Sequence, residues 1–141
     1  MTGHPYLRKV NFYETDQLGV VHHANYLKWL EEAREDFLSG TCLQGDLLWN
    51  KGIRVPVISC SCTYKKPARY PSEVLIYTTL QSYNGLRFSF HYELRLKDSG
   101  KLAARGETSH CFVDERMKPI HIQRRYPELD AEIRMLLQEN H

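Results

Sequence analysis

The sequence lacks a long hydrophobic run, and this absence limits where the protein can work. No apolar stretch approaches the ~18 residues that a membrane-spanning helix needs. The N-terminal stretch MTGHPYLRKV contains no apolar core of signal-peptide length. We therefore expect a cytoplasmic protein that does not insert into a membrane.

The sequence also lacks a strong excess of charge of either sign. Charged residues make up 26% of the 141 residues, but the formal net charge is only +2. Nucleic-acid-binding domains carry a strong positive field, so this balance argues against a nucleic-acid partner. The length lies within the range of one domain, and we expect a single domain over residues 1–141.

Metal-ligating residues are few and are not grouped. The four cysteines lack the paired spacing of a zinc site, and we expect them to be buried free thiols. They are Cys42, Cys60, Cys62 and Cys111. His22 and His23 are adjacent, so their side chains project in different directions, and no third ligand lies nearby in the sequence. The sequence predicts neither a metal nor a cofactor.

What the sequence does contain is a set of strongly alternating segments. In LRFSFHYELRL every second residue is apolar, which predicts an antiparallel strand with one buried face. That face carries Leu86, Phe88, Phe90, Tyr92, Leu94 and Leu96. Further strands are predicted for PYLRKVNFY, IRVPVISCSCTY, VLIYTTLQSY and LAARGETSHCFV. The Asn84-Gly85 pair suits a tight type I′ hairpin turn between two of them.

One long helix is predicted between the first strand and the others. It starts near Ala24 and ends near Gly40, which can supply the left-handed residue that closes a helix. Its apolar residues recur at helical spacing. They are Tyr26, Leu27, Leu30, Ala33, Phe37 and Leu38. The small residues Ala104 and Gly106 would let this helix approach the sheet closely. A short terminal helix is predicted for YPELDAEIRMLLQEN.

The segment YETDQLGVVHHANYLKWLEEAR joins the first strand to this helix. It closely resembles the N-terminal signature of acyl-CoA thioesterases of the 4-hydroxybenzoyl-CoA thioesterase and YbgC type. That signature is an aromatic residue, then T-D-x-x-G-V-V, a His or Tyr, and an N-Y or S-Y pair that opens the helix. The order strand, helix, four strands matches the hotdog fold of these enzymes. This α+β fold wraps a five-stranded antiparallel sheet around one long helix, and here a short C-terminal helix would follow.

The resemblance implies that the protein hydrolyses the thioester of an acyl-CoA. It gives Asp16 the role of attacking the thioester carbonyl or of activating the water that does. In the resembling enzymes the residue at the position of His23 offers its backbone N–H to the developing oxyanion. A helix N-terminus suits that role, because its N–H groups are unpaired and carry partial positive charge. Gly19 would let the backbone turn tightly and leave room for the thioester.

Two further residues of the segment are expected to support the catalytic groups. Tyr13 is the aromatic residue of the motif, and Glu31 lies where the resembling enzymes often have Glu. A solvated helix face is the simpler interpretation of Glu31 and Glu32. Asp16 could likewise do no more than close an Asx turn, although the intact motif favours the catalytic role.

Coenzyme A carries a pyrophosphate and a 3′-phosphate, so its binding needs cations beside the site. TYKKPARYPSE supplies Lys65, Lys66 and Arg69 in one loop, and Arg87 follows the Asn-Gly turn. These four residues are the predicted CoA contacts, with plain surface charge as the alternative. The sequence leaves the acyl group open between aromatic and aliphatic.

Two other functions stay open at this point. A hotdog dehydratase or isomerase would normally use a His base, and the Asp before the helix argues against it. A module that only binds acyl-CoA or acyl-carrier protein would gain nothing from an acid beside a thioester. Release of free thiol from acyl-CoAs would separate both from a thioesterase.

The sequence also predicts an oligomer. A single five-stranded sheet leaves an open edge, and exposed edges are usually paired or blocked. The resemblance implies a homodimer or homotetramer in which each active site is built from two subunits.

Overall fold

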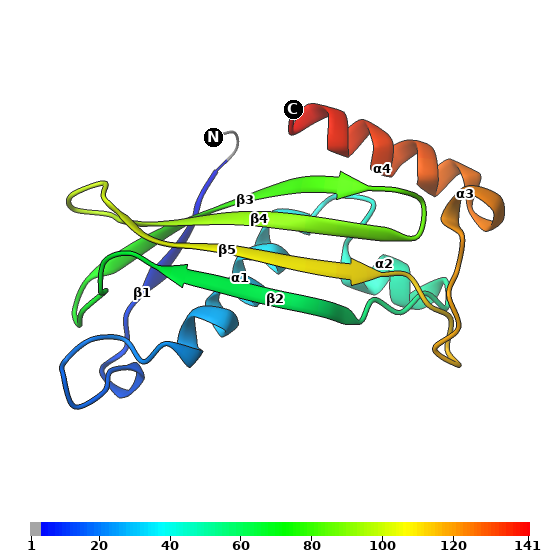
Figure 1. Ribbon diagram of the computed structural model, residues 1–141. Coiled ribbons are helices and arrows are strands. Elements are labelled where there is room, and N and C mark those ends of the chain that lie inside the picture. Colours follow the sequence, from blue (N-terminus) through cyan, green and yellow to red (C-terminus); the bar gives the residue numbers. More distant parts are fainter. Residues whose placement is uncertain (1–3) are drawn as a thin grey trace. The chain divides into compact units, whose positions relative to one another are not determined.

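The computed structural model describes residues 4–141, and within them five strands form one antiparallel sheet (Figure 1). The sheet order is β1-β3-β4-β5-β2. The strands are β1 Tyr6–Lys9, β2 Val57–Tyr64, β3 Glu73–Tyr83, β4 Arg87–Leu96 and β5 Leu102–Cys111. The helices are α1 Ala24–Leu38, α2 Gly45–Asn50, α3 Ile122–Arg125 and α4 Pro127–Glu139, with a 3-10 turn, η1, at Phe12–Glu14. None of these helices is both long and apolar enough to cross a membrane.

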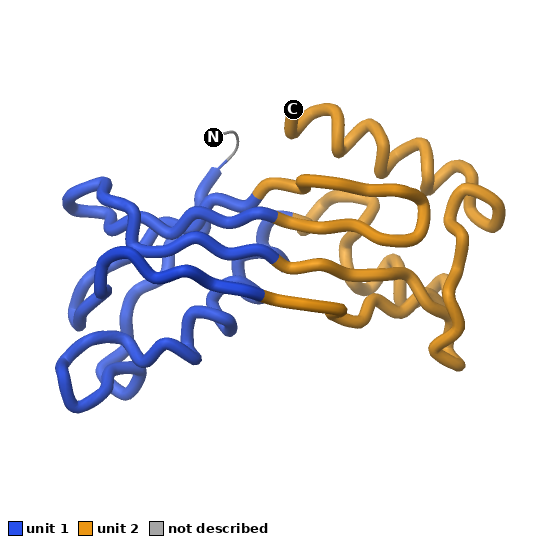
Figure 2. Tube along the Cα trace, viewed as in Figure 1, with its two compact units in different colours: residues 1–37, 61–78, 91–107 blue, residues 38–60, 79–90, 108–141 orange. Residues whose placement is uncertain are grey.

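The chain divides into two compact units (Figure 2). The first holds the residues up to Phe37 together with 61–78 and 91–107, and the second holds 38–60, 79–90 and 108–141. Strands β2 to β5 each contribute residues to both units. The expectation of a single domain over residues 1–141 stays a prediction.

Burial alternates along β4 and β5 as the sequence pattern predicts. The buried residues of β4 are Phe88, Phe90, Tyr92 and Leu94, and those of β5 include Ala104, Gly106, Thr108 and His110. The turn before β4 differs from the prediction. Gly85 has a φ of +93°, but Asn84 does not adopt a positive φ, so the turn is not of type I′. Instead, Asn84 Oδ1 accepts hydrogen bonds from the N–H groups of Leu86 and Arg87, at 3.0 and 2.7 Å.

Helix α1 approaches β5 closely at Gly106, within the first unit. A methyl group at Gly106 would lie 2.7 Å from the Leu30 Cδ1 carbon, so the strand needs glycine there. The buried residues of α1 are Tyr26, Trp29, Leu30 and Ala33. The prediction that Leu27 shares this face is wrong, because Leu27 is exposed while Trp29 is fully buried. Gly40, just beyond the helix, has the predicted left-handed conformation, with a φ of +80°.

Helix α4 confirms the predicted terminal helix, and it packs against β3 in the second unit. The Tyr83 hydroxyl donates to Asp130 Oδ1 at 2.6 Å, and Arg134 Nε donates to Asp130 Oδ2 at 2.9 Å. Just past the helix, Asn140 Oδ1 accepts a hydrogen bond from the Leu80 N–H at 2.9 Å. Strand β1 pairs with β3 only over residues 73–76 of β3. Leu80 lies beyond that pairing, and the Asn140 side chain gives its N–H a hydrogen-bond acceptor.

Candidate functional site

The segment between η1 and α1 folds back on itself around Asp16. Residues 15–21, called here the Asp16 turn, form a short antiparallel pairing. Thr15 pairs with Val21, and the Asp16 N–H donates to the Val20 carbonyl at 2.8 Å. Gly19 has a φ of +76°, a conformation that residues with a Cβ rarely adopt. The structure therefore assigns Gly19 the tight backbone turn that the sequence predicts for it.

The Asp16 carboxylate is half-buried and is held on one side by the backbone. Its Oδ1 accepts a hydrogen bond from the Leu18 N–H at 2.8 Å, so the Asx turn that the sequence offers as an alternative does form. Among residues 4–141, no hydrogen bond or ion pair engages Oδ2. A carboxylate fixed through one oxygen keeps the other oxygen available as a base or a nucleophile. The structural and the chemical role of Asp16 are therefore compatible.

His23 directly precedes α1 and carries an unused backbone donor. The next N–H groups of the helix start are occupied, because Ala24 donates to His22 Nδ1 at 3.2 Å and Asn25 donates to the His22 carbonyl at 3.0 Å. In the described part of the chain, no group accepts a hydrogen bond from the His23 N–H. An unpaired donor at a helix N-terminus is suited to stabilise a developing negative charge on oxygen.

A hollow of about 230 Å³ lies beside the start of α1. Its lining residues are Val20, Val21, His23, Tyr26, Tyr64, Lys65, Lys66 and Pro67. The Tyr64 hydroxyl donates to the His23 carbonyl at 3.1 Å. The structure thus brings His23 together with two predicted CoA-binding cations. Asp16 does not line the hollow itself but belongs to the turn that continues into Val20 and Val21.

The cationic loop is fastened to its surroundings through its backbone. The N–H groups of Lys65 and Lys66 both donate to the Ala103 carbonyl, at 2.8 and 3.1 Å. Arg69 pairs with Val20, which places it next to the Asp16 turn. All three cationic side chains are exposed and accessible to an anionic ligand.

Three other predicted site residues do not line this hollow. Arg87 belongs to the second unit, where it lines a different hollow. Tyr13 is 81% exposed, and its hydroxyl accepts a hydrogen bond from Asn11 Nδ2. Glu31 is exposed on α1. The CoA contact of Arg87 and the supporting roles of Tyr13 and Glu31 stay predictions.

A buried carboxylate that the sequence does not single out, Glu14, anchors the turn. It is 4% exposed and accepts hydrogen bonds from the Asn11 N–H at 2.8 Å and the Trp29 indole N–H at 2.9 Å. The Arg8 guanidinium bonds to both of its oxygens, at 3.0 and 2.9 Å. Burial alone would raise the pKa of Glu14, but these donors outweigh burial and hold the pKa below its usual value. Trp29 is the sequence signal that could have pointed to a buried acceptor such as Glu14, because a buried indole N–H needs a hydrogen-bond acceptor.

The prediction that Glu31 and Glu32 form a solvated face of α1 is wrong for Glu32, which is bonded to two side chains of β1. Arg8 Nε donates to Glu32 Oε1 at 2.7 Å, and the Tyr6 hydroxyl donates to the same oxygen at 3.1 Å. Glu32 therefore joins the Arg8–Glu14 pair in one ion cluster that links β1, η1 and α1.

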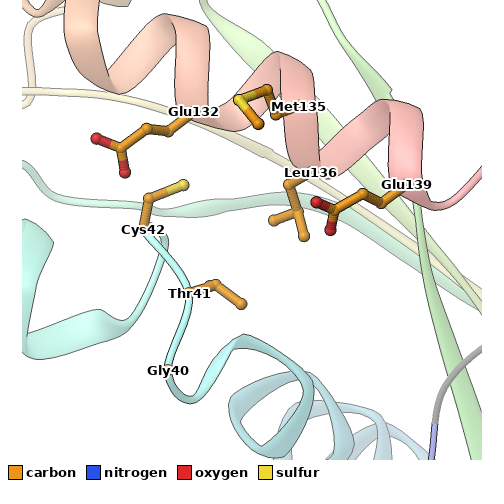
Figure 3. A pocket seen from close by; sticks show the side chains of 7 residues that line it. All are labelled: Gly40, Thr41, Cys42, Glu132, Met135, Leu136 and Glu139. Carbon is orange, nitrogen blue, oxygen red and sulfur yellow. The ribbon is translucent and has the colours of Figure 1, made fainter.

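The cysteines are not the buried thiols that the sequence predicts, because Cys60 is exposed and the other three are half-buried. Cys42 faces a hollow beside α4 (Figure 3), whose other lining residues are Gly40, Thr41, Glu132, Met135, Leu136 and Glu139. Burial raises the pKa of the Cys42 thiol to about 11, and Glu132 adds to the effect. The thiol is therefore protonated at neutral pH and is a poor nucleophile.

Within residues 4–141, no three His, Cys, Asp or Glu side chains are grouped to hold a metal ion.

Comparison with known proteins gives consistent matches over most of the chain. The family model described as "Thioesterase-like superfamily" matches residues 10–135. A Bacillus subtilis protein named "Putative acyl-CoA thioesterase YneP" is 33% identical over 121 residues, covering 85% of this chain and 87% of that protein. A 1,4-dihydroxy-2-naphthoyl-CoA hydrolase from Synechocystis is 30% identical over 109 residues, covering 77% of this chain and 79% of its own. The crystal structure of a DHNA-CoA thioesterase from Staphylococcus aureus superposes with a TM-score of 0.84 at 30% identity, covering 98% and 95% of the two chains.

The ion cluster predicts a pH-dependent loss of stability. Glu14→Gln should lower the free energy of unfolding by about 2–3 kcal/mol at pH 7, because Arg8 loses a buried charged partner. The folded pKa of Glu14 lies below the unfolded value of about 4.3, so its stabilisation is present above that pH. It is lost as the pH falls through the folded pKa. Urea unfolding of wild type and variant should therefore converge toward acid pH.

Glu31→Gln is the matched control for this measurement, because Glu31 is exposed on α1. Its free energy of unfolding should stay within about 0.5 kcal/mol of wild type. Equal stability of Glu14→Gln and wild type at pH 7 would show that the cluster does not hold the fold.

Proposed function

Because the chain belongs to the thioesterase-like superfamily, we propose that it hydrolyses the thioester of an acyl-CoA to the free acid and CoA at the start of α1. Family membership confirms two predictions from the sequence, the hotdog fold and a thioester hydrolase. The observation that carries the proposal is the unpaired His23 N–H in a residue that lines one hollow with Lys65 and Lys66.

In the proposed reaction, the thioester carbonyl oxygen accepts a hydrogen bond from the His23 N–H. This donor and the positive end of the helix stabilise the oxyanion as the carbonyl carbon is attacked. Asp16 either attacks that carbon, forming an anhydride that water then hydrolyses, or takes a proton from the attacking water. The C–S bond breaks in both routes, and CoA leaves as a thiolate. Gly19 supplies the turn that holds Asp16 in place.

The phosphates of CoA would lie over the cationic loop. Lys65 and Lys66 line the same hollow as the oxyanion donor, and Arg69 pairs with the Asp16 turn. The backbone of Lys65 and Lys66 is fastened to the Ala103 carbonyl, which holds the bases of these two side chains beside the hollow. Arg87 is a further proposed phosphate contact.

The relatives make an aromatic acyl-CoA the first substrate to test. Two of them are named for hydrolysis of 1,4-dihydroxy-2-naphthoyl-CoA or its abbreviated form, DHNA-CoA. The hollow presents the rings of Tyr26 and Tyr64, which pack edge to face with centroids 5.0 Å apart. Such rings offer contacts to an aromatic acyl group.

We propose in addition that the active protein is at least a dimer joined at β2, with each site built from two chains. Strand β2 stands at the end of the sheet order, with β5 as its only neighbour in the described sheet. Seven of its eight residues are exposed, and they include Val57 and Ile58 at 51% and 42% exposure. An open strand edge with exposed apolar side chains favours pairing with a second copy. Pairing of two such dimers would give the tetramer that the resemblance also implies.

Asp16→Asn tests the proposed reaction directly. The substitution preserves the shape of the side chain but removes its basicity and nucleophilicity, so turnover of an acyl-CoA should fall by ~10²-fold or more. Folding should be intact by circular dichroism and thermal melting. Near-normal hydrolysis by the folded variant would refute the proposed chemistry.

His23→Ala is the companion variant, and it should lose less activity than Asp16→Asn because the backbone N–H survives the change. A loss equal to that of Asp16→Asn would mean that the imidazole itself takes part.

Charge reversal in the cationic loop should affect binding more than chemistry. Lys65→Glu, Lys66→Glu or Arg69→Glu should raise KM for acyl-CoA and weaken its dependence on salt, with kcat almost unchanged. Lys101→Glu is the matched control, because Lys101 is exposed in another turn and its charge change is the same. Steady-state kinetics at two salt concentrations measures both effects. If no reversal in the loop changes KM, the phosphates bind elsewhere.

Ile58→Lys tests the β2 interface, because it places a charge on the proposed dimer edge. Sedimentation should show a dimer or tetramer for wild type and a shift toward monomer for the variant, with a parallel loss of activity. Leu47→Lys, at an exposed position on α2, is the control and should change neither property. A wild-type protein that is monomeric and active at assay concentration would rule out shared sites.

A further inference from the structure

Asn25, the second residue of α1, is hydrogen-bonded to both sides of the Asp16 turn. Its side-chain amide donates to the Glu14 carbonyl at 2.9 Å, and its backbone N–H donates to the His22 carbonyl at 3.0 Å. The His22 N–H donates to the same Glu14 oxygen at 2.8 Å. Glu14 stands two residues before Asp16, and His22 directly precedes His23. One residue thus ties the segment of the acid to the segment of the oxyanion donor.

The bond to the His22 carbonyl matters because peptide groups are planar. The His22 C=O and the His23 N–H belong to one trans peptide group and point in opposite directions. When the Asn25 N–H holds that carbonyl, it also fixes the direction of the unpaired His23 N–H. The side-chain bond to Glu14, together with the bond from the His22 N–H to the same oxygen, then sets where this peptide lies relative to the segment that leads into Asp16.

We propose that Asn25 is a positioning residue that sets the place of the His23 N–H relative to Asp16, and so controls the chemical step. This inference rests on the proposed thioester hydrolysis. Asn25 is half-buried and uncharged, and it acts on the reaction only through the backbone of the turn. Displacing catalytic groups by about 1 Å can slow a reaction by ~10²-fold, so the loss of this tie should be visible in kcat.

The contacts that anchor α1 in the core do not involve the Asn25 amide. Trp29 and Leu30 anchor α1 in the core at 0% and 1% exposure. The Glu14 carboxylate is held separately, by Arg8 and by the Trp29 indole. Removing the amide should therefore loosen the turn while the helix and the ion cluster stay in place.

The test compares Asn25→Ala and Asn25→Ser with wild type, with Asp16→Asn and with Lys28→Ala. Lys28 is exposed one turn further along α1 and serves as the matched control. Steady-state kinetics on one acyl-CoA, corrected for the folded fraction from thermal melts, gives kcat and KM for each protein. Asn25→Ala should lower kcat ~10- to 100-fold with KM within about twofold of wild type. Asn25→Ser keeps a donor and should regain part of kcat, and Lys28→Ala should match wild type.

The outcomes separate the failure of this inference from that of the proposed function. Wild-type kcat in Asn25→Ala, or a loss carried by KM alone, overturns the positioning role if Asp16→Asn is inactive. Equal CoA release by wild type and Asp16→Asn would overturn the proposed function instead. If Asn25→Ala does not fold, Asn25→Leu decides, because it also removes the donor to the Glu14 carbonyl but keeps the size of the side chain. An unchanged kcat in Asn25→Leu overturns the inference, and a lower kcat at unchanged KM supports it.

Discussion

A buried carboxylate is stable only with its full set of donors, and Glu14 obtains them from separate segments. Arg8 belongs to β1, Trp29 belongs to α1, and the Asn11 N–H lies just before η1. An unpaired charge at 4% exposure would cost several kcal/mol, so these segments have to converge when the chain folds. Their convergence holds η1 beside the start of α1, and the connection between the two is the Asp16 turn. The geometry of the proposed site therefore depends on an ion cluster that takes no part in the chemistry.

The proposed site divides its tasks between side chains and backbone. Asp16 supplies the reactive group, whereas His23 contributes a peptide N–H, which is not an ionisable group. The positive end of α1 adds to that donor without any further side chain. Lys65 and Lys66 line the same hollow and offer charge for binding rather than for bond breaking. The two hydrogen bonds of Asn25 link the segment before Asp16 to the segment before His23.

The sequence predicts the elements whose signal is local. Period-two alternation predicts β4 and β5, helical spacing predicts α1 and α4, and the need for a small residue beneath α1 is met at Gly106. Helices α2 and α3 have six and four residues, too few to show a period. Helical spacing alone also favours Leu27 over Trp29, whose buried indole N–H is paired with the distant acceptor Glu14. Glu14 itself could not be predicted, because its donors lie up to 15 residues away and meet it only through tertiary packing. Asp16 is singled out by the resemblance of its motif to that of known thioesterases, because the residue by itself could do no more than close an Asx turn.

In the proposed function, the start of α1 breaks the thioester bond of an acyl-CoA. Release of free CoA thiol from a panel of aromatic and aliphatic acyl-CoAs, including 3-hydroxyacyl and enoyl thioesters, tests this claim. The purified protein should release thiol and free acid in equal amounts from at least one of these substrates, with saturation kinetics. A folded protein that binds acyl-CoAs without releasing thiol would contradict the claim. So would one that changes the acyl group while the thioester stays intact.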